Sequence, residues 1–350
     1  MNVILPVAGK SSRFPNVRPK WLLTNPNGNF MIVDSIISMG LDNITSLNLI
    51  YLKEHEDKFS FKKGLIQNLK KYNLDSLLNF IELESETKNQ IETIQLGLKT
   101  INKDISFVIK DCDNAFKLNL SSLENNFVSY CKLENFNGTD IASKSYMHLD
   151  NMNVITNIVE KKVISDKFCC GAYYFTSSYE FLKYSNIDSE NLYVSDVVFN
   201  MILNGKTFVG LECSDYEDWG TIEAWNLYKS TFKTLFVDID GTIVKNSSSY
   251  LTPYIGETTE LIDNLNYLKQ LVNSGRVEII LTTSRPKEYR DVTKKQLFEL
   301  GLKYKELIMG LQHSKRIIIN DFSNTNPYKS CEAINIPRDS DNLKQYLKYE

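Results

Sequence analysis

The chain has 350 residues and a formal net charge of −3, from 40 Lys and Arg against 43 Asp and Glu. This balance excludes recognition of nucleic acid or an anionic membrane through bulk charge, so any phosphate binding must be local. The length exceeds the size at which one hydrophobic core usually stops growing, and two domains are expected. No apolar run approaches membrane-spanning length, and the first strand begins without a basic leader. We therefore expect a cytoplasmic protein with no nucleic-acid partner and no membrane insertion.

Short apolar runs alternate with longer amphipathic stretches along the whole chain. Strands are predicted at 2–8, 47–52, 79–83, 105–110, 171–176, 207–211, 234–239, 277–282 and 316–320. Helices are predicted at 34–41, 59–71, 90–100, 194–204, 222–232, 258–273, 286–300 and 341–347. This alternation favours an α/β fold with parallel sheets covered by helices. No Pro/Gly/Ser-rich linker is present, and we predict domains at 1–231 and 232–350.

The six cysteines show no pattern typical of a metal site or a disulfide framework. None of them forms a Cys-x-x-Cys pair. In a chain expected in the cytoplasm, we predict reduced core or surface thiols.

A small-residue loop follows the first predicted strand. It runs from Ala8 to Ser12 and is followed by the basic residues Arg13, Arg18 and Lys20. Small residues let backbone N–H groups approach an anion, and the basic side chains add charge. Taken alone, the pattern is equally typical of an ordinary loop with solvated basic residues.

Four segments in chain order resemble the sugar-1-phosphate nucleotidyltransferases, the nucleotide-sugar pyrophosphorylase family. They are Ala8-Gly9-x-x-x-Arg13 with Pro19-Lys20-x-Leu22-Leu23, the run 105–116, Glu160-Lys161 with 171–175, and Asp218-Trp219-Gly220-Thr221. The resemblance implies a Rossmann-like three-layer α/β/α fold in the first domain. It also implies in-line attack of a substrate phosphate on the α-phosphorus of an NTP, with pyrophosphate leaving and catalysis through positioning and charge.

The same resemblance assigns roles to individual residues. Arg13 and Lys20 would hold the triphosphate and the leaving pyrophosphate. Nucleotide and phosphate contacts fall on Ala8, Gly9, Lys10, Ser11, Ser12, Gln90, Glu160, Lys161 and Gly171. A Mg²⁺ ion, which offsets repulsion between phosphates, would be held by Asp111, Asp113 and Asp218.

Nucleotide and acceptor identity stay open in the sequence. The family usually carries Gly-Gly-x-Gly-Thr where this chain has Ala8-Gly9-Lys10-Ser11-Ser12. Gln90 and Thr93 could hydrogen-bond a base edge, but neither residue type selects one of the common NTPs. The acceptor is expected to be a phosphorylated sugar or polyol.

A second constellation begins at the predicted strand 234–239. Asp238 and Asp240 leave the same face of that strand, because side chains alternate with period two, and two close carboxylates need a hard cation such as Mg²⁺. The run 234–242, the run 278–286 and the run 316–322 resemble motifs of the haloacid-dehalogenase (HAD) phosphatases. The resemblance implies a capless, Rossmann-like HAD fold.

The HAD resemblance also implies roles for individual residues. Asp238 would be the nucleophile and Asp240 the general acid/base. Thr283 and Ser284 would bind phosphate, and Asp238, Asp240 and Asp321 would hold a second Mg²⁺.

The lysine motif of the HAD family has no direct counterpart. Lys315 could serve from a shifted position, or His313 could replace it, and Asn320 stands where a second acid would add charge. Two alternatives therefore stay open. In the first, the HAD unit binds phosphate or has a regulatory role without hydrolysis. In the second, the N-terminal domain is a binding scaffold and the HAD phosphatase is the only enzyme. The favoured hypothesis is a bifunctional enzyme of capsule or surface-polysaccharide precursor synthesis. Its partners would be an NTP and a phosphorylated small molecule, with homo-oligomerisation left open.

Overall fold

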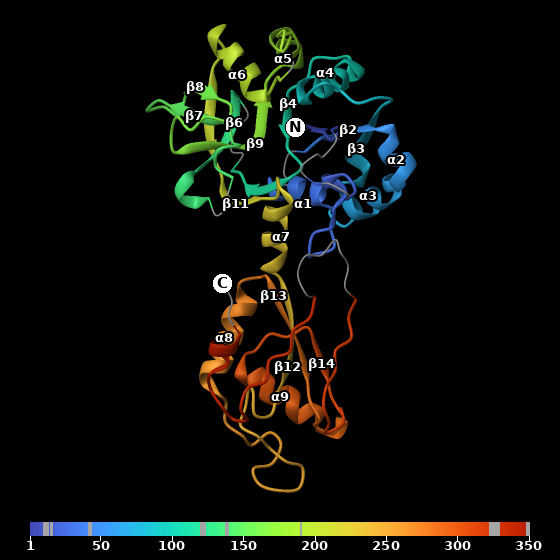
Figure 1. Ribbon diagram of the computed structural model, residues 1–350, viewed down its shortest axis with the longest axis vertical. Helices are drawn as coiled ribbons and strands as arrows, with labels where there is room; N and C mark the ends of the chain where they lie inside the picture. Colours follow the sequence, from blue (N-terminus) through green and yellow to red (C-terminus); the bar gives the residue numbers. More distant parts are fainter. Residues whose placement is uncertain are drawn as a thin grey trace. The chain divides into compact units, whose positions relative to one another are not determined.

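The computed structural model describes residues 1–9, 14, 17–40, 44–119, 124–136, 140–189, 191–321 and 330–347. The chain divides into two compact units, Met1–Lys229 and Ser230–Glu350 (Figure 1). Among the described residues, no helix combines the length and apolarity needed to cross a membrane.

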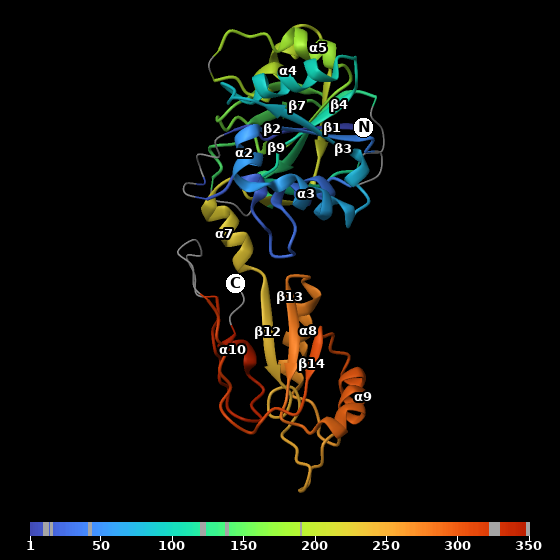
Figure 2. The same ribbon diagram turned by 90° about the vertical axis from the view of Figure 1, so that its right-hand side faces the viewer.

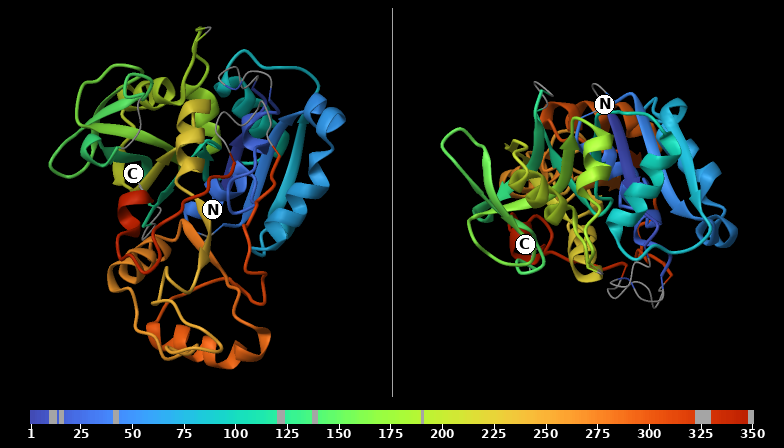
Figure 3. Two further views of the ribbon diagram at one scale, coloured as in Figure 1. Left: turned by 60° about the horizontal axis from the view of Figure 1, so that its bottom comes forward. Right: turned by 90° about the horizontal axis from the view of Figure 1, so that it is seen from above.

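The first unit is built on one large sheet. In the described part of the chain this sheet has nine strands, seven of which follow the order β10-β6-β9-β4-β1-β2-β3, while β7 and β8 form a hairpin beside β9 (Figures 1 and 3). The strands are β1 (Asn2–Pro6), β2 (Ser46–Leu52), β3 (Leu78–Leu83), β4 (Phe107–Lys110), β6 (Asn126–Lys132), β7 (Tyr146–Leu149), β8 (Ile155–Val159), β9 (Lys167–Phe175) and β10 (Phe208–Glu212). A separate antiparallel pair joins β5 (Asn114–Lys117) to β11 (Ser214–Asp218).

The sheet is mixed, which corrects the prediction of purely parallel sheets. β4, β1, β2 and β3 are parallel, but β9 runs antiparallel to both β4 and β6. β9 is also antiparallel to β7, so among the described strands it runs against each one that it pairs with. The segments 114–117, 126–132, 146–149, 155–159 and 214–218 were not predicted as strands.

Helices cover both faces of this sheet. They are α1 (Met31–Ser38), α2 (Lys53–Phe59), α3 (Phe61–Lys70), α4 (Gln90–Ile101), α5 (Ser178–Tyr184), α6 (Val194–Leu203) and α7 (Ile222–Ser230). Because strand side chains alternate, β1 sends Val3 and Leu5 into a core with α1 and α3, and Ile4 into a core with α4, α5 and α6. Figure 2 shows the three layers, with α4 and α5 on one side of the strands and α3 on the other.

The second unit contains a small parallel sheet. In the described residues its strand order is β12-β13-β14, with β12 (Lys233–Asp238), β13 (Val277–Thr282) and β14 (Glu306–Ile308). Its helices are α8 (Ile262–Asn273), α9 (Arg290–Leu300) and α10 (Leu343–Tyr346). Leucines of α8, α9 and α10 share one core with the strands.

The prediction of a strand at 316–320 is wrong. Residues 311–321 form no strand, and Ile317, Ile318 and Ile319 are 73%, 53% and 93% exposed. An apolar run becomes a strand only where its backbone groups find a neighbouring strand, and this run pairs with none of the described strands. The acid that follows it, Asp321, is therefore not carried to the end of the sheet.

Candidate functional site

A polar cavity of about 700 Å³ opens where several strands of the first unit end. The cavity wall includes nine of the predicted site residues: Gly9, Lys20, Gln90, Asp111, Asp113, Glu160, Lys161, Gly171 and Asp218. Ala8 lies beside this wall as a buried residue. The predicted contacts Lys10, Ser11, Ser12 and Arg13 lie outside the described residues. Segments more than 200 residues apart in the chain thus meet at one cavity.

Asp113 and Asp218 are brought together by the β5–β11 pair. Asp218 is opposite Asn114 in the strand register, and the backbone N–H of Trp219 donates to the carbonyl of Asp113 at 2.8 Å. Both carboxylates line the cavity. The two acids that the sequence placed in one metal site are therefore neighbours in the fold.

Each of these two acids faces a lysine. Lys20 forms an ion pair with Asp113, and Lys144 lies 2.9 Å from the carboxylate of Asp218. The Lys144 ammonium also donates to the hydroxyl of Tyr216 at 3.0 Å. Lys144 was not identified from the sequence, because it belongs to none of the recognised motifs and no charge pattern around it indicates a site residue.

Asp111 is held in the cavity wall by a side-chain amide. Its carboxylate accepts a hydrogen bond from the Gln90 side chain at 2.8 Å. Exclusion from water, and next the charge of Asp113, raise the pKa of Asp111. Gly171 has a φ of +91°, and a Cβ there would lie 2.6 Å from Asp111 Oδ2, so only glycine fits this approach.

A buried lysine fixes the turn that carries these acids. The Lys110 ammonium donates to Ser35 Oγ at 2.6 Å, to the Asp111 carbonyl at 2.7 Å and to the Asn114 side chain. Burial lowers the pKa of Lys110 to about 8. The ammonium thereby joins Ser35 of α1 to the turn, and this role was not predicted from the sequence.

Glu160 and Lys161 stand side by side at another part of the wall. The Glu160 carboxylate accepts hydrogen bonds from Ser145 and, at 2.8 Å, from Ser195. Lys161 has a φ of +52° and donates to the hydroxyl of Tyr193. The serines and the tyrosine were not singled out from the sequence, where only the Glu-Lys pair matched a pattern.

The segment expected to read a base is occupied by internal hydrogen bonds. Thr93 Oγ1 lies 2.6 Å from Thr87 Oγ1, and Thr93 is buried. Gln90 donates to Asp111, as described above, and Asn89 caps α4 by accepting from the Glu92 N–H at 3.0 Å. Gln90 and Thr93 thus have internal partners, and both line the cavity together with Thr87, Lys88 and Asn89.

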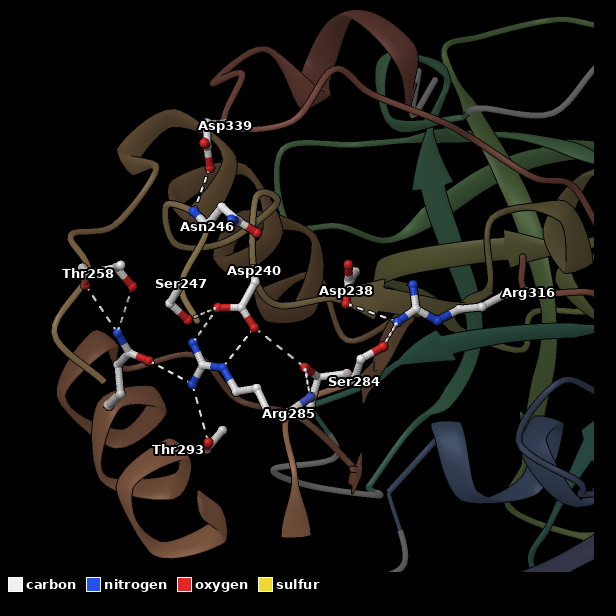
Figure 4. A network of polar contacts seen from close by, with 12 residues as sticks. Asp238, Asp240, Asn246, Ser247, Thr258, Ser284, Arg285, Thr293, Arg316 and Asp339 are labelled. Atoms are coloured by element: carbon white, nitrogen blue, oxygen red, sulfur yellow. Dashed lines mark hydrogen bonds and ion pairs between the residues drawn. The ribbon is translucent and has the colours of Figure 1, made fainter. Parts of the chain in front are cut away.

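In the second unit, Asp240 is clamped by a buried arginine (Figure 4). Arg285 Nε and one of its terminal nitrogens each lie 2.8 Å from a different oxygen of the Asp240 carboxylate. Ser247 donates to the same carboxylate at 2.6 Å. The far side of the Arg285 guanidinium donates to Thr293 and Gln296 of α9, which fixes its plane.

Asp238 lies at the end of β12 with fewer partners. Arg316 lies 3.4 Å from its carboxylate and 3.3 Å from Ser284 Oγ, as Figure 4 shows. Burial raises the pKa of Asp238 despite this arginine. Thr283 is buried beneath, with a long 3.5 Å contact to Asp240. Arg316 was not predicted as a site residue.

Two predicted members of the second site stand elsewhere. Lys315 and Asp321 are exposed, and neither has a described contact with Asp238 or Asp240. Among the described residues of both units, no group of three or more His, Cys, Asp or Glu side chains is arranged to hold a metal ion. In particular, Asp111 accepts from Gln90, Asp113 pairs with Lys20, and Asp218 contacts both Lys144 and the backbone N–H of Gly220.

The fold of the first unit is shared with solved structures of nucleotide-sugar enzymes. A nucleoside-diphosphate-sugar pyrophosphorylase from Vibrio cholerae RC9 matches with a TM-score of 0.53 and 17% identity, covering 65% of this chain and 99% of that one. The inositol-1-phosphate CTP transferase from T. maritima matches with a TM-score of 0.52 and 12% identity, over 65% and 94%. A UDP-glucose pyrophosphorylase complexed with UDP-glucose matches with a TM-score of 0.50 and 13% identity, over 65% and 97%.

No protein-family model matches the chain, and no curated protein sequence matches it significantly. The solved structures match 65% of this chain, and the first unit, residues 1–229 of 350, makes up the same share. The first unit therefore has the mixed α/β, Rossmann-like fold of the nucleotidyltransferases.

Proposed function

We propose that the first unit is a Mg²⁺-dependent nucleotidyltransferase. It would transfer a nucleotidyl group from an NTP to a sugar or polyol phosphate and release pyrophosphate. The observation that carries this proposal is the meeting of Asp113 and Asp218 at one polar cavity, each facing a lysine. Structural neighbours with the same fold include a pyrophosphorylase holding UDP-glucose and a CTP transferase.

The donor set of Asp113 and Asp218 fits Mg²⁺. This ion is usually held by one or two carboxylates together with substrate phosphates and water, so a cluster of three protein acids is not required. When bound, Mg²⁺ would neutralise charge on the phosphate oxygens. Asp111, bonded to Gln90, would act behind these two acids by fixing the turn.

The remaining charges of the cavity suit two phosphate-bearing substrates. Lys20 and Lys144 would turn from the acids towards phosphate oxygens once the cation is present, and Lys161 would orient the acceptor phosphate. Positioning of this kind lowers the barrier without a covalent enzyme intermediate. Glu160, which already accepts from Ser145 and Ser195, would take a hydroxyl of the acceptor.

The direct experiment is a substrate screen. Each of the four common NTPs is incubated with a library of sugar and polyol phosphates and Mg²⁺, and pyrophosphate and orthophosphate are followed separately. Pyrophosphate release that requires both an NTP and an acceptor supports the proposal. Orthophosphate release alone would count against it and would leave the second unit as the only enzyme.

For the second unit we propose hydrolysis of a phosphate monoester. Asp238 is one-third exposed and lies beside Arg316 and Ser284, so a phosphate approaching its carboxylate would meet a guanidinium and a hydroxyl. Asp238 would attack phosphorus and displace the leaving oxygen, and water would then attack the aspartyl phosphate and release orthophosphate. Asp240, oriented by Arg285, would pass a proton to the leaving oxygen and recover one from the attacking water.

The alternative for this unit is phosphate binding without turnover. The clamp on Asp240 and the exposed Lys315 and Asp321 favour it. Asp238→Asn separates the two: an enzyme loses orthophosphate release, whereas a binding unit keeps its affinity for a phosphate monoester. Two activities on one chain would suit a bisphosphorylated precursor of a cytoplasmic surface-polysaccharide pathway.

A further inference from the structure

Three cysteines of the first unit form a buried cluster. Cys131 lies in β6, Cys170 in β9, and Cys213 between β10 and β11. All three are buried and unbridged. The Cys213 thiol donates to the sulfur of Cys170 at an S–S separation of 3.0 Å. A disulfide needs a separation of roughly 2.05 Å, so a movement of about 1 Å would allow the bond.

The third thiol, Cys131, supplies the thiolate, because burial raises the pKa of Cys170 and the hydrogen bond with Cys131 raises the pKa of Cys213. The thiols of Cys170 and Cys213 hydrogen-bond to Cys131 and lower its pKa, which favours the thiolate. A thiolate is the form that reacts with peroxides and disulfides, and its negative charge here is shared within the cluster. The neighbouring Cys169 faces the opposite core, with α4 and α6, as strand alternation requires.

Short stretches of chain connect the cluster to Asp111 and Asp218 in the cavity wall. Cys170 lines the cavity and precedes Gly171, whose carbonyl accepts from the Asp111 N–H at 2.8 Å. Cys213 directly precedes β11, which ends at Asp218. Cys170, although only 1% exposed, is the cluster residue that lines the cavity, and a bond between the two sulfurs would tie β9 to the strand that carries Asp218.

We propose that Cys170 and Cys213 are a peroxide-sensitive redox pair in the wall of the cavity. Two thiols and one hydrogen peroxide give one disulfide and two waters. Two S–H bonds and the O–O bond break, and the S–S bond forms. The sulfurs lose two electrons to the peroxide oxygens, which take up both thiol protons. The Cys131 thiolate attacks the peroxide, one neighbouring thiol displaces the hydroxyl of the resulting sulfenic acid as water, and the other thiol exchanges with this mixed disulfide, which leaves the Cys170–Cys213 bond and a free Cys131 thiol.

Peptide mapping of the folded, full-length protein tests the pair. The protein is treated with hydrogen peroxide, alkylated after unfolding, and digested without reductant. We expect a linked species that joins the peptide containing Cys170 to the peptide containing Cys213, and its loss after reduction. Because Cys169 shares a peptide with Cys170, Cys169→Ser is the matched control: it should keep the link, whereas Cys170→Ser should lose it.

The wild-type protein alone can overturn the proposal, so the result does not depend on whether a variant folds. Exposed Cys331 serves as an internal marker that peroxide has reacted. Oxidised Cys331 together with fully alkylated Cys170 and Cys213 would refute the redox pair. A link that survives in Cys170→Ser would assign it to Cys169 and equally refute it.

Discussion

The ammonium of Lys144 lies 2.9 Å from the carboxylate of Asp218, and the side chains are 15% and 8% exposed. The lysine precedes β7 and the acid ends β11, so the pair closes the cavity wall from two distant segments. The lysine supplies the positive charge that the buried acid needs.

Lys144→Met leaves the Asp218 carboxylate buried without its cation. We expect the free energy of unfolding to fall by about 1–3 kcal/mol, the cost of a buried unpaired polar group. If Asp218 binds Mg²⁺, the ion should recover more stability in the variant than in the wild type, because it binds the folded state and meets no competing ammonium. Thermal unfolding with and without Mg²⁺ measures this. Lys117→Met, which removes an exposed partner of Asp215 on the same strand, should respond to Mg²⁺ like the wild type.

Gly171→Ala tests the close approach of β9 to Asp111. The substitution places a Cβ 2.6 Å from Asp111 Oδ2 at a φ of +91°. Backbone strain and overpacking together should cost about 2–4 kcal/mol. Gly205→Ala is the control, since its φ is +79° but nothing lies within 4 Å. It should lose only about 1 kcal/mol in urea unfolding. Equal losses in the two variants would show that the Asp111 contact costs nothing.

Arg285→Met tests the clamp in the second unit. Removing one partner of a buried ion pair leaves the other uncompensated, and a loss of about 3–5 kcal/mol is expected in urea unfolding of that unit. Arg285→Lys should recover only part of this, because an ammonium cannot match both carboxylate oxygens of Asp240 and both α9 partners. Lys295→Met, which removes the exposed partner of Glu299 on α9, should change little. A full recovery in Arg285→Lys contradicts the importance of the bidentate geometry.

Lys110 gives the first unit a characteristic dependence of stability on pH. Burial lowers its pKa from 10.5 to about 8, so between these values the unfolded chain binds a proton that the folded chain does not. The contribution of Lys110 to the free energy of unfolding therefore increases by about 3 kcal/mol in total as pH rises from about 8 to 10.5. Comparing wild type with Lys110→Met at several pH values isolates the contribution. The wild-type slope should exceed that of the variant, and equal slopes would contradict the buried charge.

The sequence predicted those features that short patterns determine. The apolar runs at 47–52 and 79–83 became β2 and β3, and Asp113 and Asp218 were recognised before the fold placed them together. A strand followed by an acid is a local signal, because it needs only alternating side chains and a turn.

The sequence did not predict features that depend on distant partners. Lys144 meets Asp218, and Lys110 meets Ser35, only after folding. The contact between Thr93 and Thr87 also forms only in the folded chain. The run at 316–320 has strand composition, but composition does not supply the neighbouring strand that its backbone requires.

The account rests on Asp113 and Asp218 acting together in nucleotidyl transfer. The most direct measurement is pyrophosphate release by Asp113→Asn and Asp218→Asn with the NTP and acceptor that the wild type uses. Asp215→Asn is the control, because Asp215 lies on the same strand, is exposed, and has a φ of +55° that asparagine tolerates. We predict that Asp113→Asn and Asp218→Asn lower the rate of pyrophosphate release at least 100-fold, the order expected when charge stabilisation at the reacting phosphate is removed. Asp215→Asn should keep the wild-type rate. Wild-type rates in Asp113→Asn and Asp218→Asn would contradict the account.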